Sequence, residues 1–231
     1  MKNIGIIYCA VGDENYYELA LNSINSIEED ISISVFTDDI GYEFFKQNSN
    51  ANILKINSIT EKRAKLECFN KTPYDNTLYL DADTVVCKEL ISDFKILKNF
   101  DIACCHDSMR YANVKLELYN ENKNLFGDIP LSFPEYNTGV IFYKKNKITQ
   151  ELFKSWTDTY DIINYPDSLH DKIDQPSFRY ALYYSPVNVS TLPIEYNVTP
   201  GLKKLYNTSP KSWNFKIGIE HLCRGYRIKI K

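Results

Sequence analysis

The sequence predicts an α/β fold in which helices flank a mostly parallel central sheet. Short apolar segments alternate with segments of helical periodicity through the first half of the chain, a pattern typical of strands joined by crossover helices. Three of the apolar segments end at or next to Cys9, Asp38 and Asp81. Because ligands bind beyond the carboxyl ends of parallel strands, these three positions are expected to meet in one crevice.

The elements of the first half follow from their apolar patterns. A helix over 14–29 has an apolar face that includes Tyr17 and Ile24. A second helix is expected to begin near Thr60, which suits an N-cap, and to stop before Pro73. Strands are expected at 3–8, at 31–36, at 53–56 and from Leu78 through the segment that contains Asp81 and Asp83.

The second half mixes strands and helices with less regular alternation. Strands are expected at 101–105, 138–143 and 191–194, and helices at 148–163 and 171–184. The polar stretch 108–135 is expected to form helix and loop over the pocket. No internal repeat, low-complexity linker or composition break divides the sequence, so one domain over 1–231 is expected.

Two carboxylates one residue apart are the most informative feature of the sequence. Asp81 and Asp83 follow the apolar run Leu78-Tyr79-Leu80. In an extended segment, side chains at i and i+2 point the same way, so both carboxylates can share one ligand. They repel each other unless a cation lies between them, and oxygen ligands suit Mg²⁺ or Mn²⁺. The alternative interpretation is a strand followed by an acidic turn.

Composition excludes several classes of protein. The chain has 44% hydrophobic and 25% charged residues and a net charge of −3, which is ordinary for a globular protein and gives no general attraction to nucleic acid. No stretch approaches the 18 or so apolar residues of a membrane span. The six cysteines lack the paired spacing of a zinc site or a disulfide framework. Free thiols in a reducing cytoplasm fit this pattern, and the expected location is therefore cytoplasmic.

The segment after Thr199 is basic, in contrast to the rest of the chain. One acid, Glu220, stands against Lys203, Lys204, Lys211, Lys216, Arg224, Arg227, Lys229 and Lys231. Three interpretations stay open: a solvated basic tail, contacts with substrate phosphates, or peripheral contact with anionic lipid.

The usual glycine-rich phosphate loops are absent from the sequence. It contains neither G-x-x-x-x-G-K-[ST] nor G-x-G-x-x-G, so neither a P-loop nor a dinucleotide fingerprint can hold phosphates. A metal bound by Asp81 and Asp83 would supply the substitute, because it can bind diphosphate oxygens and neutralise their charge.

Four blocks in order along the chain resemble one enzyme family. The segments 65–69 and 72–86 resemble the DxD region of GT-A nucleotide-sugar glycosyltransferases, closest to the glycogenin-like group, glycosyltransferase family 8. Tyr136-Asn137-Thr138-Gly139-Val140-Ile141-Phe142 resembles the N-[ST]-G-V strand of that group, and Asp174-Gln175 resembles its D-Q pair. Ile219-Glu220-His221, followed by Arg224-Gly225, resembles its metal histidine and phosphate loop, although Tyr226-Arg227 replaces the usual K-P-W-like ending.

The resemblance implies a fold and a reaction. The fold would be a single GT-A (Rossmann-like) domain with a small antiparallel element beside the mostly parallel sheet, with a nucleotide-binding half at 1–105 and a donor-sugar and acceptor half at 106–231. The reaction would be transfer of a sugar from a nucleotide diphosphate, most simply UDP, to an acceptor hydroxyl with retention of configuration. That hydroxyl could belong to a glycan, a lipid-linked acceptor or a protein. Mn²⁺ or Mg²⁺ would be the cofactor.

The resemblance also implies roles for individual residues. Metal ligands would be Asp81, Asp83 and His221. Nucleotide contacts would come from Cys9, Ala10, Val11, Tyr16, Asp38, Arg63, Lys65, Asp81 and Ala82. Sugar or acceptor contacts would come from Asp107, Asn137, Thr138 and Gly139, phosphate contacts from Arg224 and Gly225, and catalysis from Asn137, Asp174 and Gln175.

Some of these residues have competing structural interpretations. His221 could be an ordinary surface or core residue, and Arg63 and Lys65 could lie on a solvated helix face. Asp174 could cap the helix that begins before Pro176. No residue is an obvious covalent nucleophile, which favours front-face attack assisted by the leaving phosphate.

Two other functions fit parts of the sequence. Asp81-Ala82-Asp83-Thr84 also matches the D-x-D-x-T motif of haloacid dehalogenase-like phosphatases, in which the first Asp is the nucleophile and Mg²⁺ assists. That motif normally lies near the amino terminus and is followed by a late acidic pair. The third interpretation is a nucleotide-sugar-binding module without turnover, against which the apparently intact acidic and histidine residues argue.

Overall fold

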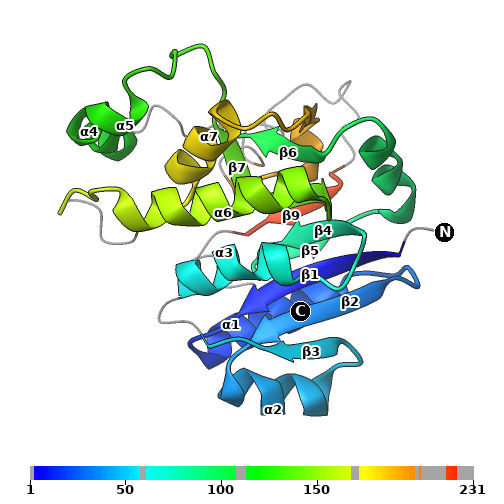
Figure 1. The fold of residues 1–231 in the computed structure, drawn as a ribbon. Helices are drawn as coiled ribbons and strands as arrows, with labels where there is room; N and C mark the ends of the chain where they lie inside the picture. The colour runs from blue at the N-terminus through cyan, green and yellow to red at the C-terminus, as the bar shows by residue number, and fades with distance from the viewer. Residues whose placement is uncertain are drawn as a thin grey trace.

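A seven-stranded sheet forms the centre of the protein (Figure 1). The computed structural model describes residues 3–57, 61–107, 113–167, 172–200, 203 and 217–222. The strand order is β3-β2-β1-β4-β7-β6-β8, and β7 alone runs antiparallel to its neighbours. The strands are β1 (Ile4–Ala10), β2 (Ser32–Thr37), β3 (Asn52–Lys55), β4 (Asn76–Leu80), β6 (Ile102–His106), β7 (Tyr136–Lys144) and β8 (Val189–Leu192). The predicted α/β class with a mostly parallel sheet is confirmed.

The small antiparallel element is a separate two-stranded sheet. It pairs β5 (Thr84–Val86) with β9 (Ile219–His221), with Thr84 opposite His221. The prediction of one continuous strand from Leu78 through both aspartates was therefore wrong. The chain leaves β4 after Leu80, turns through residues 81–83 and enters β5, because β5 pairs with β9 and not with the central sheet.

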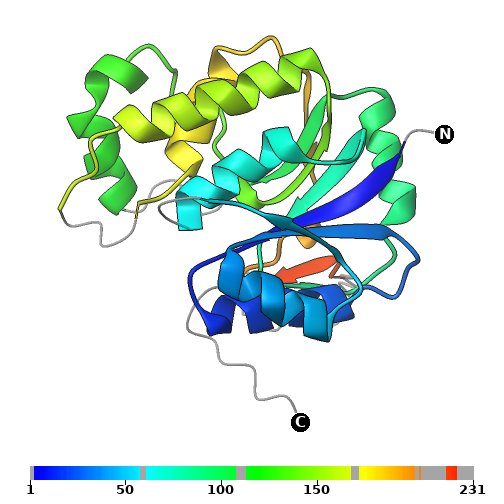
Figure 2. The same cartoon turned by 60° about the horizontal axis from the view of Figure 1, so that its bottom comes forward.

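Helices cover both faces of the sheet (Figures 1 and 2). On one face α3 (Glu61–Lys71), α6 (Lys147–Ile162) and α7 (Gln175–Tyr183) pack over an aromatic core that contains Phe69 and Trp156. On the other face lie α1 (Glu14–Asn25), α2 (Asp39–Asn48) and the 3₁₀ helix η1 (Ile91–Lys98). Strand β1 supplies both cores, since Ile7 faces the first and Ile6 the second. A strand buried on both faces explains its continuous apolar run.

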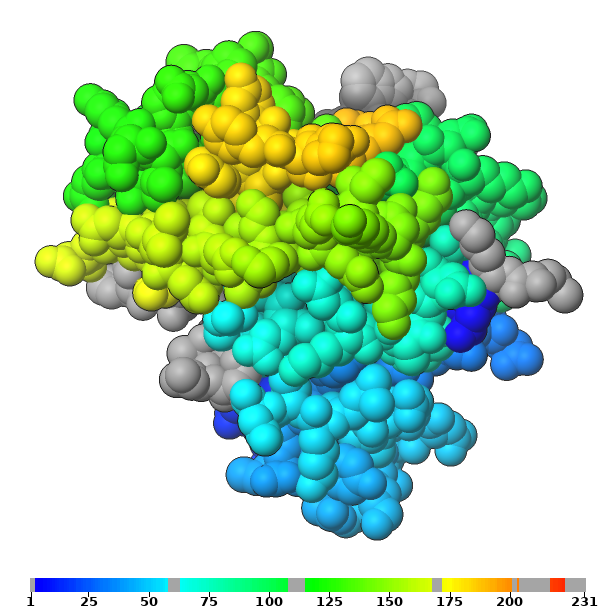
Figure 3. Space-filling view, viewed as in Figure 1, coloured from blue at the N-terminus to red at the C-terminus, as the bar shows by residue number. Residues whose placement is uncertain are grey.

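The space-filling view shows the helices of the first face from outside (Figure 3). Helix α6 crosses the visible surface, with α3 along one side and α7 along the other. Beyond α7 lie two short helices, α4 (Asn113–Glu121) and α5 (Lys123–Phe126), which confirm the helix expected within 108–135. No helix among the described residues is long and apolar enough to cross a membrane.

Three elements of this fold were not predicted, and others have different ends. Helix α2 and the 3₁₀ helices η1 and η2 (Ile194–Tyr196) were missed. Within α2, Gly41 reads as a helix breaker, but a side chain there would collide with Thr37 and Tyr17, so glycine is required by close packing. Helix α1 ends at Asn25 and not at residue 29, and α7 begins at Gln175 and not at residue 171.

The order of the strands determines where a ligand can bind. From β1 the chain moves outward through α1, β2, α2 and β3, and α3 then returns it to β4 on the other side of β1. Strands β1 and β4 are therefore the point where the direction of winding reverses. In open parallel sheets the crevice beyond the carboxyl ends of such strands is the usual ligand site.

Candidate active site

A cavity of about 280 Å³ opens beyond the carboxyl ends of β1 and β4. Residues from almost the whole length of the chain line it: Cys9, Val11, Tyr16, Lys65, Tyr79, Asp81, Ala82, Asp83, Asn137, Thr138, Asp174, Gln175 and His221. All of these except Tyr79 were expected from the sequence to belong to the site. The fold thus brings together residues that lie more than 200 positions apart in sequence.

Three of these residues form a cluster that could hold a metal ion. Asp81 and Asp83 occupy the turn between β4 and β5, and His221 ends β9. One ligand atom from each residue lies within 4.8 Å of the other two. The Nε2 atom of His221 is 3.0 Å from Asp83 Oδ1 and 3.8 Å from Asp81 Oδ2. Two carboxylates and an imidazole are a suitable donor set for Mn²⁺, and the carboxylates suit Mg²⁺.

The backbone of β7 passes directly against this triad. A Cβ atom on Gly139 would lie 2.6 Å from His221 Cε1 and 2.9 Å from Asp81 Oδ2, which is too close for either contact. The β4–β7 ladder continues past β4, because the Asp81 N–H donates to the Gly139 carbonyl at 2.8 Å. Glycine at position 139 therefore makes the space in which the triad assembles.

The charges of the triad act on one another. Burial alone would lower the pKa of His221, but the adjoining Asp83 and Asp81 carboxylates raise it above its ordinary value. Burial would raise the pKa of Asp83, and the hydrogen bond and charge of His221 lower it. Carboxylate and imidazole thus favour each other's charged forms when no ion is bound between them.

Lys65 links the triad to the other acidic residue of the cavity. Its Nζ atom is 3.0 Å from Asp81 Oδ1 and 2.9 Å from Asp174 Oδ2, and it donates to Thr138 Oγ1 at 3.1 Å. Burial disfavours its charge, but the two carboxylates more than compensate and raise its pKa. Lys65 is buried, so the alternative of a solvated helix face was wrong for this residue.

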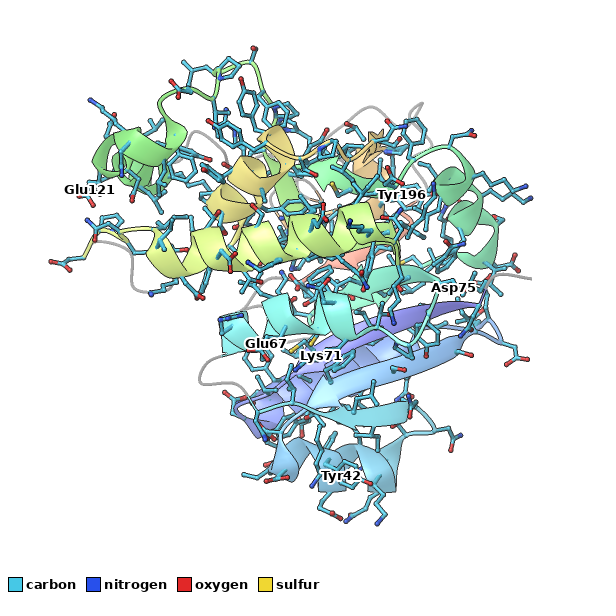
Figure 4. All side chains as sticks on the ribbon, viewed as in Figure 1. Tyr42, Glu67, Lys71, Asp75, Glu121 and Tyr196 are labelled. Carbon is cyan, nitrogen blue, oxygen red and sulfur yellow. The ribbon has the colours of Figure 1, made fainter. Side chains whose placement is uncertain are left out.

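The two faces of α3 separate Lys65 from Arg63. Arg63 forms ion pairs with Glu67 and Asp161 away from the cavity, and it does not line the cavity. Glu67 also pairs with Lys71 along the outer side of α3 (Figure 4). Arg63 is thus partly buried in ion pairs outside the cavity lining, and a nucleotide contact from it stays a prediction.

Asp174 stands at the N-cap position of α7, but its side chain makes no capping hydrogen bond. Its carboxylate turns instead toward Lys65. Its backbone carbonyl accepts from the Trp156 indole N–H at 3.0 Å and from the Ser177 hydroxyl at 2.8 Å. Gln175, the first residue of the helix, lines the cavity beside it.

Tyr79 was not predicted as a site residue. Its hydroxyl donates to Asp81 Oδ1 at 2.8 Å, so that this oxygen is held by both Tyr79 and Lys65. The other carboxylate oxygen of Asp81 remains directed at His221. In the sequence Tyr79 appears only as one apolar residue of a buried strand, which is why no pattern indicated its role.

Asp38 and Asp107 do not line the cavity. The Asp38 carboxylate caps α2 through Gly41 N–H at 2.9 Å, and it accepts from Gly12 N–H at 2.8 Å and from the Tyr17 hydroxyl. Asp38 follows β2, as predicted, and Asp107 follows β6, but capping and ion pairing occupy their carboxylates.

Asp107 is buried and forms an ion pair with Lys115.

The other expected residues are placed as follows. Ala10 is buried at the end of β1, and Gly139 lies behind the triad. Arg224 and Gly225, and most of the basic segment after Thr199, lie outside the described residues. Within that segment Lys203 forms an ion pair with Glu220 at 2.6 Å.

Comparison with known proteins was informative at the level of structure. No protein-family model and no curated protein sequence match the chain. Galactosyltransferase LgtC, solved with donor and acceptor sugar analogs, superposes with a TM-score of 0.62 at 16% identity, over 95% of this chain and 87% of that one. Mouse xyloside xylosyltransferase 1 gives a TM-score of 0.62 at 13% identity, over 97% and 99% of the two chains. The glycosyltransferase GlyE of Streptococcus pneumoniae gives 0.60 at 16% identity, over 94% and 54%.

These similarities define the class of fold. The protein has the GT-A fold, with its mixed central sheet and small antiparallel sheet. The three solved structures named above are all glycosyltransferases. At 13–16% identity the likeness establishes the fold, and the chemistry must be argued from the cavity itself.

Proposed function

We propose that this protein is a metal-dependent glycosyltransferase that moves a sugar from a UDP-sugar to an acceptor hydroxyl with retention of configuration. One observation carries the proposal. The possible metal triad, the buried Lys65–Asp174 pair and the end of β1 line a single cavity at the ligand-binding edge of a GT-A sheet. A phosphate-rich donor and a sugar could therefore be held side by side.

Asp81, Asp83 and His221 would hold Mn²⁺ or Mg²⁺. When bound, such an ion neutralises the charge that develops on a departing diphosphate. Lys65 and Tyr79 engage one oxygen of Asp81 and leave the other turned toward His221. The protein thereby presents its ligands in a nearly fixed arrangement.

The nucleotide would lie at the end of β1. Cys9, Ala10 and Val11 would cradle the base through backbone contacts, and Tyr16 would stack near it. Asp38 would support the nucleotide site indirectly and would not contact the base. Its carboxylate accepts from the Gly12 N–H, in the loop that follows Val11. Ala82, between the two aspartates, would face the ribose.

Retention is proposed through front-face attack. The Asp174 carboxylate is engaged by Lys65 at 2.9 Å, and an ion-paired carboxylate is a poor covalent nucleophile. A leaving phosphate oxygen would accept the proton of the acceptor hydroxyl on the same face. Asp174 and Gln175 would stabilise the positive charge that develops on the sugar. Analysis of the product anomer by NMR tests this step, and an inverted anomer would overturn it.

A thermal-shift panel tests the donor and the metal together. UDP-sugars and GDP-sugars are compared with and without Mn²⁺ on the wild type, on Asp83→Ala and on Asp39→Ala, whose side chain is exposed on α2. A UDP-sugar at 100 times its Kd should stabilise the wild type by about 2.7 kcal/mol. The stabilisation should require Mn²⁺, disappear in Asp83→Ala and persist in Asp39→Ala. Stabilisation that is equal with and without metal would contradict the proposal.

The other two functions predict different outcomes. A phosphatase that uses Asp81 would release inorganic phosphate from phosphomonoesters without any sugar donor. A binding module would show metal-dependent stabilisation by the nucleotide sugar but neither transfer nor hydrolysis. Measuring UDP release alongside phosphate release therefore separates all three.

A further inference from the structure

Asn197 lies behind His221 on the side away from the two aspartates. It follows the 3₁₀ helix η2 (Ile194–Tyr196) and is 3% exposed. Its neighbour Val198 donates to the Ile219 carbonyl and accepts from the His221 N–H, both at 3.0 Å. These backbone hydrogen bonds hold Asn197 beside β9, so its side chain has a defined position relative to the His221 ring.

Three hydrogen bonds connect β7 to that ring through two amide side chains. The Gly139 backbone N–H donates to Asn137 Oδ1 at 2.8 Å. The same oxygen accepts from Asn197 Nδ2 at 2.7 Å. Asn197 Oδ1 then lies 3.0 Å from His221 Nδ1.

The direction of these hydrogen bonds follows from the first one. A backbone N–H can only donate, so the Asn137 atom that faces it must be the oxygen. The Asn197 atom that faces the same oxygen must then be the nitrogen, and the oxygen of Asn197 must face His221. An amide oxygen can only accept, so His221 Nδ1 must carry a hydrogen. That hydrogen is thus determined by a backbone group on β7. Asp83 Oδ1, 3.0 Å from Nε2, can also only accept, so without a metal this carboxylate favours a hydrogen on Nε2 as well.

A neutral histidine with its hydrogen on Nδ1 carries a lone pair on Nε2. That atom faces Asp83 Oδ1 and Asp81 Oδ2. In metalloproteins, the hydrogen bond on the second ring nitrogen of a ligating histidine fixes its tautomer and the orientation of its ring.

We propose that Asn197 is a positioning residue, oriented by Asn137, that holds His221 in the Nδ1–H tautomer with Nε2 directed at a metal between Asp81 and Asp83. The metal role of His221 rests on the proposed function. The hydrogen-bonded relay itself rests only on the contacts given above, so the two can be tested separately.

The experiment measures the tautomer and the metal affinity independently of turnover. Protein labelled with ¹⁵N at histidine is studied without metal, at a pH where the ring is neutral, in an Asp83→Ala background that removes the carboxylate competing for a hydrogen on Nε2. The His221 signal is identified by its loss in His221→Ala. Mn²⁺ binding is followed by electron paramagnetic resonance with no nucleotide present. The variants are Asn197→Ala, Asn137→Ala and Asn137→Asp.

Asn122→Ala is the matched control. Asn122 is also 3% exposed, and its side chain also joins two segments, through Leu118 and Asn164. It lies in the α4–α5 region, away from the triad. Any effect of removing a buried, hydrogen-bonded asparagine as such should appear equally in this variant.

In the Asp83→Ala background we expect Nδ1–H, and its loss when Asn197→Ala is added. With Asp83 present, Asn197→Ala should lower Mn²⁺ affinity by roughly 10- to 100-fold. Asn122→Ala should keep both. Asn137→Asp keeps an oxygen that accepts from Gly139 and Asn197, so it should keep the tautomer, whereas Asn137→Ala should yield a mixture. If Asn197→Ala does not fold, the comparison of Asn137→Asp with Asn137→Ala tests the relay instead. Unchanged tautomer and affinity in Asn197→Ala, or in Asn137→Ala when only that variant folds, would overturn the relay.

The proposed function could be contradicted while the hydrogen-bonded relay is still confirmed. If the wild type bound no Mn²⁺, the metal-dependent transferase would be contradicted. An Nδ1–H tautomer in Asp83→Ala that is lost when Asn197→Ala is added would still establish the hydrogen-bonded relay.

Discussion

Gly139 and His221 touch so closely that no other residue fits at position 139. An added Cβ would lie 2.6 Å from His221 Cε1 and 2.9 Å from His221 Nδ1. The ring cannot retreat freely, because its Nδ1 atom is held 3.0 Å from Asn197 Oδ1. The glycine of the N-T-G sequence thus determines the shape of the candidate metal site by leaving space for it.

Gly139→Ala should therefore weaken metal binding. The new methyl group must displace His221 or Asp81, so we expect Mn²⁺ affinity to fall by roughly 10- to 100-fold, as for other disturbances of ligand orientation. Gly218→Ala is the control, since a Cβ there would meet Glu195 and Lys88 at 3.2 Å and would not touch the triad. Equal Mn²⁺ affinities for Gly139→Ala and the wild type would show that the ring can move aside at no cost.

Lys65→Met should destabilise the protein strongly. It leaves the carboxylates of Asp81 and Asp174 without their shared cation, and Asp174 is fully buried. Removing one partner of a buried ion pair costs about 3–5 kcal/mol. Lys71→Met on the same helix removes an ion pair whose lysine side chain is 53% exposed, which is worth about 1 kcal/mol or less. Urea unfolding of both variants checks the contrast.

A second substitution tests the same cluster. Because Asp174 would be uncharged in Asp174→Asn, Lys65→Met should cost less in that background than in the wild type. The difference is the coupling energy of the pair, which for contacting residues is about 0.5–3 kcal/mol. If the losses of stability from Lys65→Met and Asp174→Asn were simply additive, Lys65 would stabilise the protein through Asp81 and not through Asp174.

The sequence contained the local signals for most of the fold and much of the cavity. Paired carboxylates after an apolar strand, an acidic residue before a proline and a histidine in a final strand are all local patterns. Spacing alone could select Asp81 and Asp83, whereas Asp174 and His221 were selected because their segments resemble motifs of a known family. The structure gathers all four in one cavity.

What could not be predicted depends on contacts between distant segments. Asn197 meets His221 only because η2 packs beside β9, and one more asparagine in an asparagine-rich chain carries no signal. Asp38 and Asp107 do follow strands, but a cap and an ion pair occupy them. Sequence spacing indicates the position of a residue on its strand or helix, but not which distant group becomes its hydrogen-bond or ion-pair partner.

Asp38→Ala should reduce stability in a pH-dependent way. Partial burial opposes the charge of Asp38, but N–H groups of Gly41 and Gly12 and the Tyr17 hydroxyl lower its pKa. A lowered folded-state pKa stabilises the protein above the unfolded value of about 3.9, and this stabilisation is lost as pH falls through the folded-state pKa. We expect a cost of about 1–2 kcal/mol at pH 7, typical of a lost N-cap, that shrinks below about pH 4.

The neighbouring Asp39→Ala provides the comparison. Its ion pair with Lys55 is exposed, so the cost should stay below about 1 kcal/mol at pH 7. Chemical denaturation at a series of pH values measures both. If Asp38 contacted the base directly, Asp38→Ala would weaken nucleotide binding without a loss of stability. We expect the main effect of Asp38→Ala to be on stability, with nucleotide binding affected only through the loop that contains Gly12.

Lys115 should hold α4 against the sheet. Its Nζ atom pairs with Asp107, at the end of β6, and with Glu135 at 2.6 Å. Burial raises the pKa of Glu135, and the charge and hydrogen bond of Lys115 oppose that rise. Lys115→Met removes the cation from both acids and should loosen the segment that they anchor.

Hydrogen exchange resolves this effect along the chain. In Lys115→Met, amides of 113–126 should exchange roughly tenfold faster or more, because every 1.4 kcal/mol of lost local stability is a tenfold change. Amides of β1 should be unchanged. Lys123→Met, on the exposed side of α5, should leave both regions as in the wild type. Equal acceleration throughout the chain would mean that the Lys115 cluster supports the whole fold and not α4 alone.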